Sequence, residues 1–286
     1  MDMTSPSPLS PPETLDSTVT SADGTTIAYS AWGAGEPIVI IDGATAYRAT
    51  TPENAATAEL LADEFLVINY DRRGRGGSGD TPPYAVEREF EDLAAILEHV
   101  GGGRAATVFG WSSGGNLALN AAQAGVPIAR LAVFEANAVV DDDRPPLPAD
   151  YVQRAEDAVA AGRPGDAVAL FLSAAVGLPD EMIAELRQDP KEWPPLEAIG
   201  PTIAYDGRQV GDAMSGRPLR SDLWNRVDVP VLVMHGRDTW PFLAAAARAI
   251  AEHLPTATLK PVPGENHSTS PEVLAAALRQ LATEGA

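Results

Sequence analysis

Short apolar runs recur along the chain and predict buried β-strands. They lack an alternation of apolar and polar positions, which is typical of strands that are covered on both faces. Upstream of them, two runs rich in β-branched and aromatic residues flank Asp23-Gly24 and predict an antiparallel hairpin. The apolar runs are PIVIID (37–42), FLVINYD (65–71), AATVFG (105–110), RLAVFE (130–135), VPVLVMHG (229–236) and TATLKPVPG (256–264).

Between most of these runs, apolar residues recur with a spacing near 3.6 positions, which predicts helices. Strands that alternate with helices form a mainly parallel sheet with right-handed crossovers and helices on both faces. Together with the hairpin, the pattern predicts an α/β fold built on an eight-stranded, mostly parallel sheet. The helical stretches are residues 53–64, 85–101, 114–125, 241–254 and 271–283.

Residues 136–226 interrupt this alternation, because they contain no strand-like apolar run. The segment opens with the turn-rich sequence DDDRPPLPAD (141–150) and continues as short helical patterns broken by Pro and Gly. We expect a helical cap inserted between the sixth and seventh strands; helices with only a packing role are the alternative. The predicted organisation is a disordered Pro/Ser-rich tail over 1–16, a core of 17–135 and 227–286, and this cap.

Composition narrows the classes of partner. The 286 residues are 45% hydrophobic and 21% charged, as expected of a soluble globular protein. A net charge of -20 repels phosphate backbones and anionic lipids, so neither nucleic acid nor a membrane is expected as a partner. The chain has no cysteine, no signal-peptide pattern and no apolar run near the roughly 20 residues that span a bilayer. We therefore expect a cytoplasmic protein; a homodimer is compatible with the sequence.

The sequence Gly110-Trp111-Ser112-Ser113-Gly114 lies between a predicted strand and a predicted helix, which is the setting of the G-x-S-x-G nucleophile elbow. Such a sharp turn strains its central residue, and flanking glycines avoid collisions that a Cβ would cause. Ser112 is the predicted nucleophile. The backbone N–H of Ser113, at the helix start, is predicted to bind an oxyanion. The alternative is a chance match in a Gly-rich helix start.

A serine nucleophile needs a base, most often histidine. His267 lies in PGENHSTSPEVL, between the last predicted strand and the last predicted helix, where a base can meet a serine at the strand ends. His99 and His253 lie near helix ends and are interpreted as surface residues or as partners of the helix C-terminal dipole. His235 ends a strand and could line the site or pack. His267 is the predicted base.

The hairpin together with PIVIIDG, YDRRGRGGSG, VFGWSSGG, HGRD and PGENHS resembles the α/β-hydrolase fold superfamily over residues 17–284. The resemblance implies a triad in the chain order nucleophile, acid, histidine. It also implies a second oxyanion donor in the loop after PIVIID, at Gly43 or Ala44, where many relatives have His-Gly and this chain has Asp42. The chemistry within this superfamily varies widely.

Two residues are candidates for the acid of the triad. Families of this fold usually place it after the strand VPVLVMHG in a G-x-x-D pattern, but Thr239 follows Gly236 at that distance and Asp238 comes one residue early. Glu135 ends an otherwise apolar strand, where a buried carboxylate needs a partner such as histidine. A glutamate there, a G-x-S-S-G elbow and Asp-Gly after the first parallel strand are also similar to zearalenone lactonases. Glu135 is favoured over Asp238; a loop carboxylate is the alternative for each.

Nothing in the sequence indicates a metal or an organic cofactor, because there is no His/Asp/Glu cluster at metal spacing and no phosphate-binding fingerprint. Arg72, Arg73 and Arg75 in YDRRGRGGSG are predicted to pair with carboxylates rather than with phosphate. The predicted reaction therefore uses protein side chains alone.

Aromatic residues next to these loops predict an apolar pocket: Trp111, Tyr47 and, from the cap, Trp193. We expect a serine hydrolase that cleaves an ester or lactone of an uncharged, fairly hydrophobic small molecule through an acyl-enzyme. C–C bond hydrolysis and perhydrolysis with the same residues are the chemical alternatives. A small-molecule receptor or a biosynthetic cyclase of hydrolase fold is the alternative without hydrolytic turnover.

Overall fold

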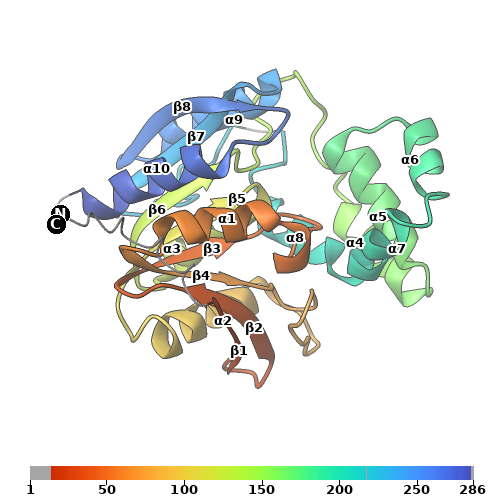
Figure 1. The fold of residues 1–286 in the computed structure, drawn as a ribbon. Helices are drawn as coiled ribbons and strands as arrows, with labels where there is room; N and C mark the ends of the chain where they lie inside the picture. Colours follow the sequence, from red (N-terminus) through yellow and green to blue (C-terminus); the bar gives the residue numbers. More distant parts are fainter. Residues whose placement is uncertain (1–13, 217, 285–286) are drawn as a thin grey trace, which may run out of the picture.

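The computed structural model describes residues 14–216 and 218–284. Its centre is an eight-stranded sheet in the order β1-β2-β4-β3-β5-β6-β7-β8 (Figure 1). β2 pairs antiparallel with β1 and β4, and all strand pairs from β4 to β8 are parallel. The predicted sheet is thus confirmed. The strands are β1 (Thr14–Thr20), β2 (Thr26–Trp32), β3 (Glu36–Ile41), β4 (Phe65–Tyr70), β5 (Ala106–Trp111), β6 (Ile128–Phe134), β7 (Val231–Asp238) and β8 (Ala257–Glu265).

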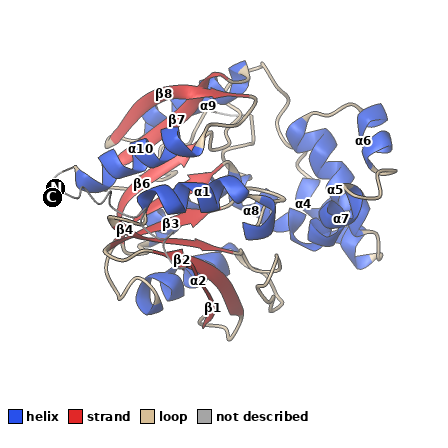
Figure 2. Ribbon diagram, viewed as in Figure 1, coloured by secondary structure: helices blue, strands red, loops and turns tan. Residues whose placement is uncertain are grey.

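Helices cover both faces of the sheet (Figure 2). Successive side chains of a strand point to opposite faces, and β3 shows the result. Ile38 and Ile40 pack in one apolar cluster with α1 (Pro52–Leu61) and α10 (Pro271–Thr283). Val39 and Ile41 pack in a second cluster with three other helices, α2 (Val86–His99), α3 (Ser113–Ala124) and α9 (Pro241–His253). The five helices expected in the core are therefore present, with ends within a few residues of prediction.

The first strand begins earlier than predicted. Thr14 pairs with Trp32, and Leu15 and Asp16 pair with the next residues of β2. Residues 14–16 thus belong to the sheet, because their backbone groups complete the ladder of the hairpin. This corrects the predicted boundary of the tail at residue 16. The remainder of that predicted tail, residues 1–13, lies outside the described residues.

Helices form the segment between β6 and β7, and α4 to α7 lie to one side of the sheet (Figure 1). They enclose an apolar cluster of their own that includes Ala155, Val168 and Ile203. The short helices after residue 192 were not predicted, because Pro and Gly interrupt their patterns. The elements are α4 (Tyr151–Ala160), α5 (Pro164–Leu170), the π-helix η2 (Phe171–Val176), α6 (Asp180–Leu186), α7 (Trp193–Ile199), the 3-10 helix η3 (Gly200–Thr202) and α8 (Ile203–Val210).

Across residues 14–216 and 218–284, no helix is both long enough and apolar enough to cross a membrane.

Candidate active site

Ser112 occupies a sharp turn between β5 and α3. Its backbone has φ 50° and ψ −122°, a conformation that costs a residue other than glycine free energy. A Cβ at Gly110 would lie 2.3 Å from the carbonyl oxygen of Gly114, and one at Gly114 would lie 2.5 Å from that of Ile41. Both positions therefore require glycine. The predicted turn, with Ser112 at its strained centre, is confirmed.

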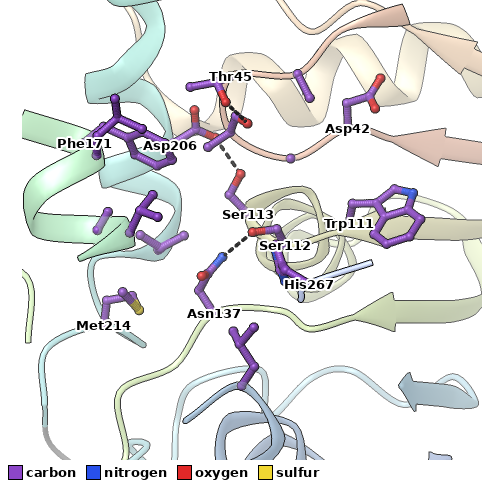
Figure 3. A pocket seen from close by; sticks show the side chains of 18 of the residues that line it. Asp42, Thr45, Trp111, Ser112, Ser113, Asn137, Phe171, Asp206, Met214 and His267 are labelled. Atoms are coloured by element: carbon purple, nitrogen blue, oxygen red, sulfur yellow. Dashed lines mark hydrogen bonds between the residues drawn. The ribbon is translucent and has the colours of Figure 1, made fainter. Parts of the chain in front are cut away.

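The two adjacent serines have different hydrogen-bond partners (Figure 3). The hydroxyl oxygen of Ser112 accepts a hydrogen bond from Nδ2 of Asn137 at 3.1 Å. The hydroxyl of Ser113 donates to Asp206 at 2.7 Å and is buried. Of the two serines, only Ser112 is partly exposed. The side chain of Ser113 is thus bound to the protein, whereas that of Ser112 is available to a ligand.

His267 lies on a two-residue turn directly after β8. The backbone groups of Glu265 and Ser268 form hydrogen bonds of 2.9 and 3.0 Å across this turn, and Asn266 and His267 between them have φ 49° and 63°. Positive φ at both central residues is the geometry of a tight hairpin turn. The turn presents the imidazole to the carboxyl ends of the strands.

The carboxylate beside His267 is that of Glu135. Oε2 of Glu135 lies 2.5 Å from Nδ1 of His267, and Oε1 accepts a 2.9 Å hydrogen bond from the N–H of Gly236. Glu135 has no exposed surface, and its φ of 50° places it, like Ser112 and His267, in the left-handed region. A carboxylate at Nδ1 keeps a proton there and leaves Nε2 to accept another. Ser112 and His267 line one cavity and Glu135 is bonded to His267, and strained backbone at such a group of residues is typical of a functional site.

The alternative acid lies elsewhere. Asp238 is exposed at the end of β7, in register with Glu265, and forms no ion pair or hydrogen bond with His267 in the described ranges. Two of the three other histidines are also bound elsewhere: His235 bonds to the carbonyl of Gly236, and His253 to that of Leu223. Ser112 and His267 line the same cavity, although no hydrogen bond joins them in the part of the chain that the structure describes.

The loop after β3 lies against Ser112. A Cβ at Gly43 would be 3.1 Å from Cβ of Ser112, so the two backbones approach closely. Gly43, Ala44 and Ser113 all line the cavity. As the first residue of α3, Ser113 has an N–H without an intrahelical acceptor. The carbonyl of Gly43 accepts a 2.8 Å hydrogen bond from Arg75, which holds this loop in place.

Buried charges connect this site to α8. Asp206 accepts hydrogen bonds from Ser113, Arg72 and Arg75. Arg72 also binds Glu89 through bonds of 2.6 and 2.8 Å. Burial acts to raise the pKa of Asp206, but Arg72 and Arg75 outweigh it and hold the pKa below its ordinary value. Because Arg73 likewise pairs with two aspartates, the predicted pairing of the three arginines with carboxylates is confirmed.

Asp42 is a second buried carboxylate on the cavity wall. It is 1% exposed, and its two oxygens accept hydrogen bonds from the side-chain amides of Asn54 at 2.6 Å and Asn69 at 3.2 Å. Burial raises the pKa of Asp42 from 3.8 to about 6, against the opposing effect of Asn69. Asn54 also accepts a 2.8 Å hydrogen bond from the indole of Trp111, so this carboxylate belongs to a polar chain that ends at the elbow.

The cavity has a volume of about 520 Å³ and lies between the strand ends and the helical segment. Trp111 lines it, as predicted, but Tyr47 and Trp193 do not. Trp193 is buried in the apolar cluster of the helical segment, beneath the guanidinium of Arg187. Tyr47 closes the turn of the 3-10 helix η1 (Arg48–Thr50), where its N–H and carbonyl both bind Thr50. The apolar lining includes Leu147, Tyr151, Phe171, Leu172, Val210, Met214, Trp240 and Phe242.

Two groups near the nucleophile were not predicted. Asn137 follows Glu135 by two residues, and Asp206 lies on a helix whose pattern is too short to recognise. A polar residue three positions after a buried strand is a signal that could have drawn attention to Asn137. Within the described ranges, no cluster of three or more His, Cys, Asp or Glu side chains is placed to hold a metal ion.

Comparisons with known proteins agree with this fold. Residues 32–277 match the model of a family described as the alpha/beta hydrolase family. A non-heme chloroperoxidase from Streptomyces lividans is 32% identical over 272 residues, which cover 90% of this chain and 96% of the relative. The solved structure of an alpha/beta hydrolase from Sphaerobacter thermophilus DSM 20745 is 44% identical, covers 93% of this chain and 99% of its own, and superposes with a TM-score of 0.81.

A thermophilic esterase from Thermogutta terrifontis shares the fold at 24% identity, with a TM-score of 0.67 over 93% of this chain and 97% of the esterase. The segment that matches the family model begins at the last residue of β2 and ends within α10, so it includes strands β3 to β8, the elbow and the turn of His267. The chain therefore belongs to the alpha/beta hydrolase family and is a hydrolase.

Proposed function

We propose that this protein hydrolyses an ester or a lactone with a mainly apolar body, through an acyl-enzyme on Ser112. The observation that carries the proposal is the position of His267. Its Nδ1 lies 2.5 Å from the fully buried carboxylate of Glu135, and its ring lines the cavity into which the strained turn of Ser112 opens. A carboxylate, an imidazole and a serine in this order form the arrangement that activates a hydroxyl group.

In the proposed reaction, Oγ of Ser112 attacks the acyl carbonyl while Nε2 of His267 takes the hydroxyl proton. Glu135 keeps the imidazole in the tautomer with a proton on Nδ1 and stabilises the imidazolium. The contact between nucleophile and base often tightens only when substrate binds. The N–H groups of Ser113 and of Gly43 or Ala44 donate to the oxyanion, and His267 returns the proton to the leaving oxygen.

Deacylation repeats these steps with water. His267 takes a proton from water, the hydroxide oxygen attacks the acyl carbonyl, and the bond to Oγ of Ser112 breaks as the proton returns to it. The products are a carboxylic acid and the free enzyme. No metal or organic cofactor enters this sequence of steps.

The cavity supports a small substrate. Its volume of about 520 Å³ is in the range of small-molecule pockets, and its lining is mostly apolar with a few polar groups. Residues of the helical segment, Tyr151 and Met214 among them, form part of that lining. We therefore keep the interpretation of residues 136–226 as a cap that closes over the substrate.

Perhydrolysis is a second candidate, and the 32% identity to a protein named non-heme chloroperoxidase favours it. If hydrogen peroxide replaces water in deacylation, the acyl group leaves Ser112 as a peracid, and the peracid can then oxidise a halide. The same nucleophile and base serve both reactions. An assay for peracid with an ester donor, with and without hydrogen peroxide, measures the share of each.

Labelling with a fluorophosphonate probe tests the nucleophile. We expect the wild-type protein to be labelled on the peptide that contains Ser112, the Ser112→Ala variant to remain unlabelled, and the Ser113→Ala variant to be labelled. Hydrolysis of a chromogenic ester should follow the same order. Label on Ser113, a labelled Ser112→Ala variant, or an unlabelled wild-type protein would each contradict the proposal.

A further inference from the structure

Arg144 lines the same cavity as Ser112 and His267 and has no carboxylate partner among the residues that the structure describes. Of the described residues that form the cavity wall, it is the only arginine or lysine. The ion pairs within residues 14–216 and 218–284 engage most arginines of this acidic chain, but none of them includes Arg144. The adjacent acidic residues of the loop, Asp141 to Asp143, are exposed and do not pair with it. Among these described residues, Arg144 is thus the single unpaired cation on a mostly apolar wall.

Two contacts hold the guanidinium group of Arg144 in place. It stacks over the ring of Phe242, with 4.5 Å between Cζ and the ring centroid. One of its terminal nitrogens donates to the carbonyl oxygen of Ala175, in η2. Arg144 therefore bridges the helical segment and the start of α9. These contacts use one of the five N–H donors of the group, and the other four have no protein acceptor among the described residues.

Burial makes this cation costly. The side chain is half-buried, and this burial lowers the pKa of Arg144. The guanidinium nevertheless keeps its proton at neutral pH. A charge that has lost part of its water and has no counter-ion destabilises the structure around it. An anion in the cavity would remove that cost, and the planar fork of the remaining donors matches a carboxylate.

The carboxylates on the cavity wall do not supply this anion. Asp206 is bound by Arg72 and Arg75, and Asp42 accepts hydrogen bonds from two asparagine amides. Glu53 is exposed at the beginning of α1 and forms no ion pair in the described ranges. Within residues 14–216 and 218–284, Arg144 therefore has no negative partner.

We propose that the substrate carries a carboxylate at some distance from its scissile ester or lactone bond, and that Arg144 binds this carboxylate. This inference rests on the proposed function of Ser112. It revises the expectation of an uncharged substrate to an apolar body with one anionic end. The competing role for Arg144 is that of a tether, through Ala175, between the loop 141–150 and η2.

Two p-nitrophenyl esters of equal chain length test the proposal: the octanoate, which is neutral, and the monoester of suberic acid, which ends in a carboxylate. For Arg144→Gln we expect kcat/KM for the suberate ester to fall by about 10-fold or more, mainly through KM, because charge-assisted hydrogen bonds are lost. The octanoate should change less than about twofold. Arg144→Lys, which keeps the charge but not the fork, should give an intermediate loss.

Arg226→Gln is the matched control, because it removes one positive charge at an exposed position off the cavity wall. It should leave both esters unchanged. Equal losses for both esters in Arg144→Gln would show a tether and overturn the proposal. No loss for either ester would overturn it too, as would a wild-type protein that hydrolyses the octanoate but not the suberate ester. Loss of octanoate hydrolysis in Ser112→Ala establishes the proposed function separately from all these results.

Discussion

The side-chain amide of Asn137 donates a 3.1 Å hydrogen bond to the hydroxyl oxygen of Ser112 (Figure 3). The backbone of Asn137 is fixed in turn by Asn116, whose side chain binds both its N–H and its carbonyl at 2.8 and 2.9 Å. A donor at the oxygen of Ser112 occupies one of its lone pairs, so the hydroxyl hydrogen points away from Asn137. In the proposed reaction the acceptor of that hydrogen is His267.

Replacement of Asn137 by alanine should slow acylation with little effect on folding. Loss of one hydrogen bond of ordinary strength corresponds to a fall in kcat of about 5- to 10-fold. The bonds between Asn137 and Asn116 use only the backbone of Asn137, so they survive the substitution. Rates of fluorophosphonate inactivation and of ester turnover measure the effect. Asn225→Ala, at an exposed position, is the control, and an unchanged inactivation rate would refute a positioning role for Asn137.

Substitution of the two candidate acids should have very different effects on kcat. Glu135→Gln keeps the volume and the acceptor for Gly236 but removes the charge beside His267. By analogy with triads that lose their carboxylate, kcat should fall by about 10³- to 10⁴-fold. Asp238→Asn should retain kcat near that of the wild type, because Asp238 is exposed and forms no hydrogen bond or ion pair with His267 in the described residues. If only Asp238→Asn is inactive, Glu135 is not the acid.

Asp206→Asn should destabilise the protein strongly. It leaves two buried guanidinium groups, those of Arg72 and Arg75, with less compensation, and removal of one partner from such a cluster costs about 3–5 kcal/mol. Asp212→Asn is the control, because Asp212 and its partner Arg220 are both 60% exposed and such pairs contribute about 1 kcal/mol or less. Urea unfolding measures the loss of unfolding free energy in both variants. Equal, small losses in free energy of unfolding would show that the Asp206 cluster does not stabilise the fold.

Asp42 predicts a pH dependence of stability. Burial raises its pKa in the folded protein to about 6, above the ordinary value of 3.8, so the folded state binds its proton more tightly than the unfolded state. The contribution of Asp42 to stability is therefore complete at low pH and is lost as pH rises through 6. Relative to Asp42→Asn, the wild type should lose about 2 kcal/mol of unfolding free energy between about pH 4.5 and pH 7.5.

Denaturant unfolding of the wild type and of Asp42→Asn at several pH values measures this difference. The substitution also disturbs the hydrogen bonds from Asn54 and Asn69, but that cost does not depend on pH. The change in the difference with pH is thus the informative quantity. Two stability curves that stay parallel across this range would mean that the pKa of Asp42 is not raised.

Local sequence was sufficient to predict much of the site. The glycines around Ser112 predicted the turn, because backbone strain and close approach at one bend depend on residues within a few positions of each other. The position of His267 after the last strand followed in the same way from chain order. Glu135 was favoured because a charged residue ended an apolar run, which implies a partner somewhere in the fold.

Other features of the site could be recognised only in the tertiary structure. The sequence could not show that Trp193 is buried among its own helices or that Tyr47 closes a turn, since both are aromatic residues near predicted loops. Asn137 gave too weak a signal, because a single polar residue in a loop has many possible roles. The link between Ser113 and Asp206 joins residues 93 positions apart, one of them on a helix too short to predict.

The sequence by itself determined the alternation of strands and helices, the bend at Ser112 and the place of His267 along the chain, because periodicity and turn chemistry act over neighbouring residues. Only the tertiary structure decided which carboxylate meets the imidazole, since Glu135 and His267 are 132 positions apart. It also decided that Arg144 stands on the cavity wall without a carboxylate partner among the described residues. Such contacts depend on how distant segments pack, and no local pattern encodes them.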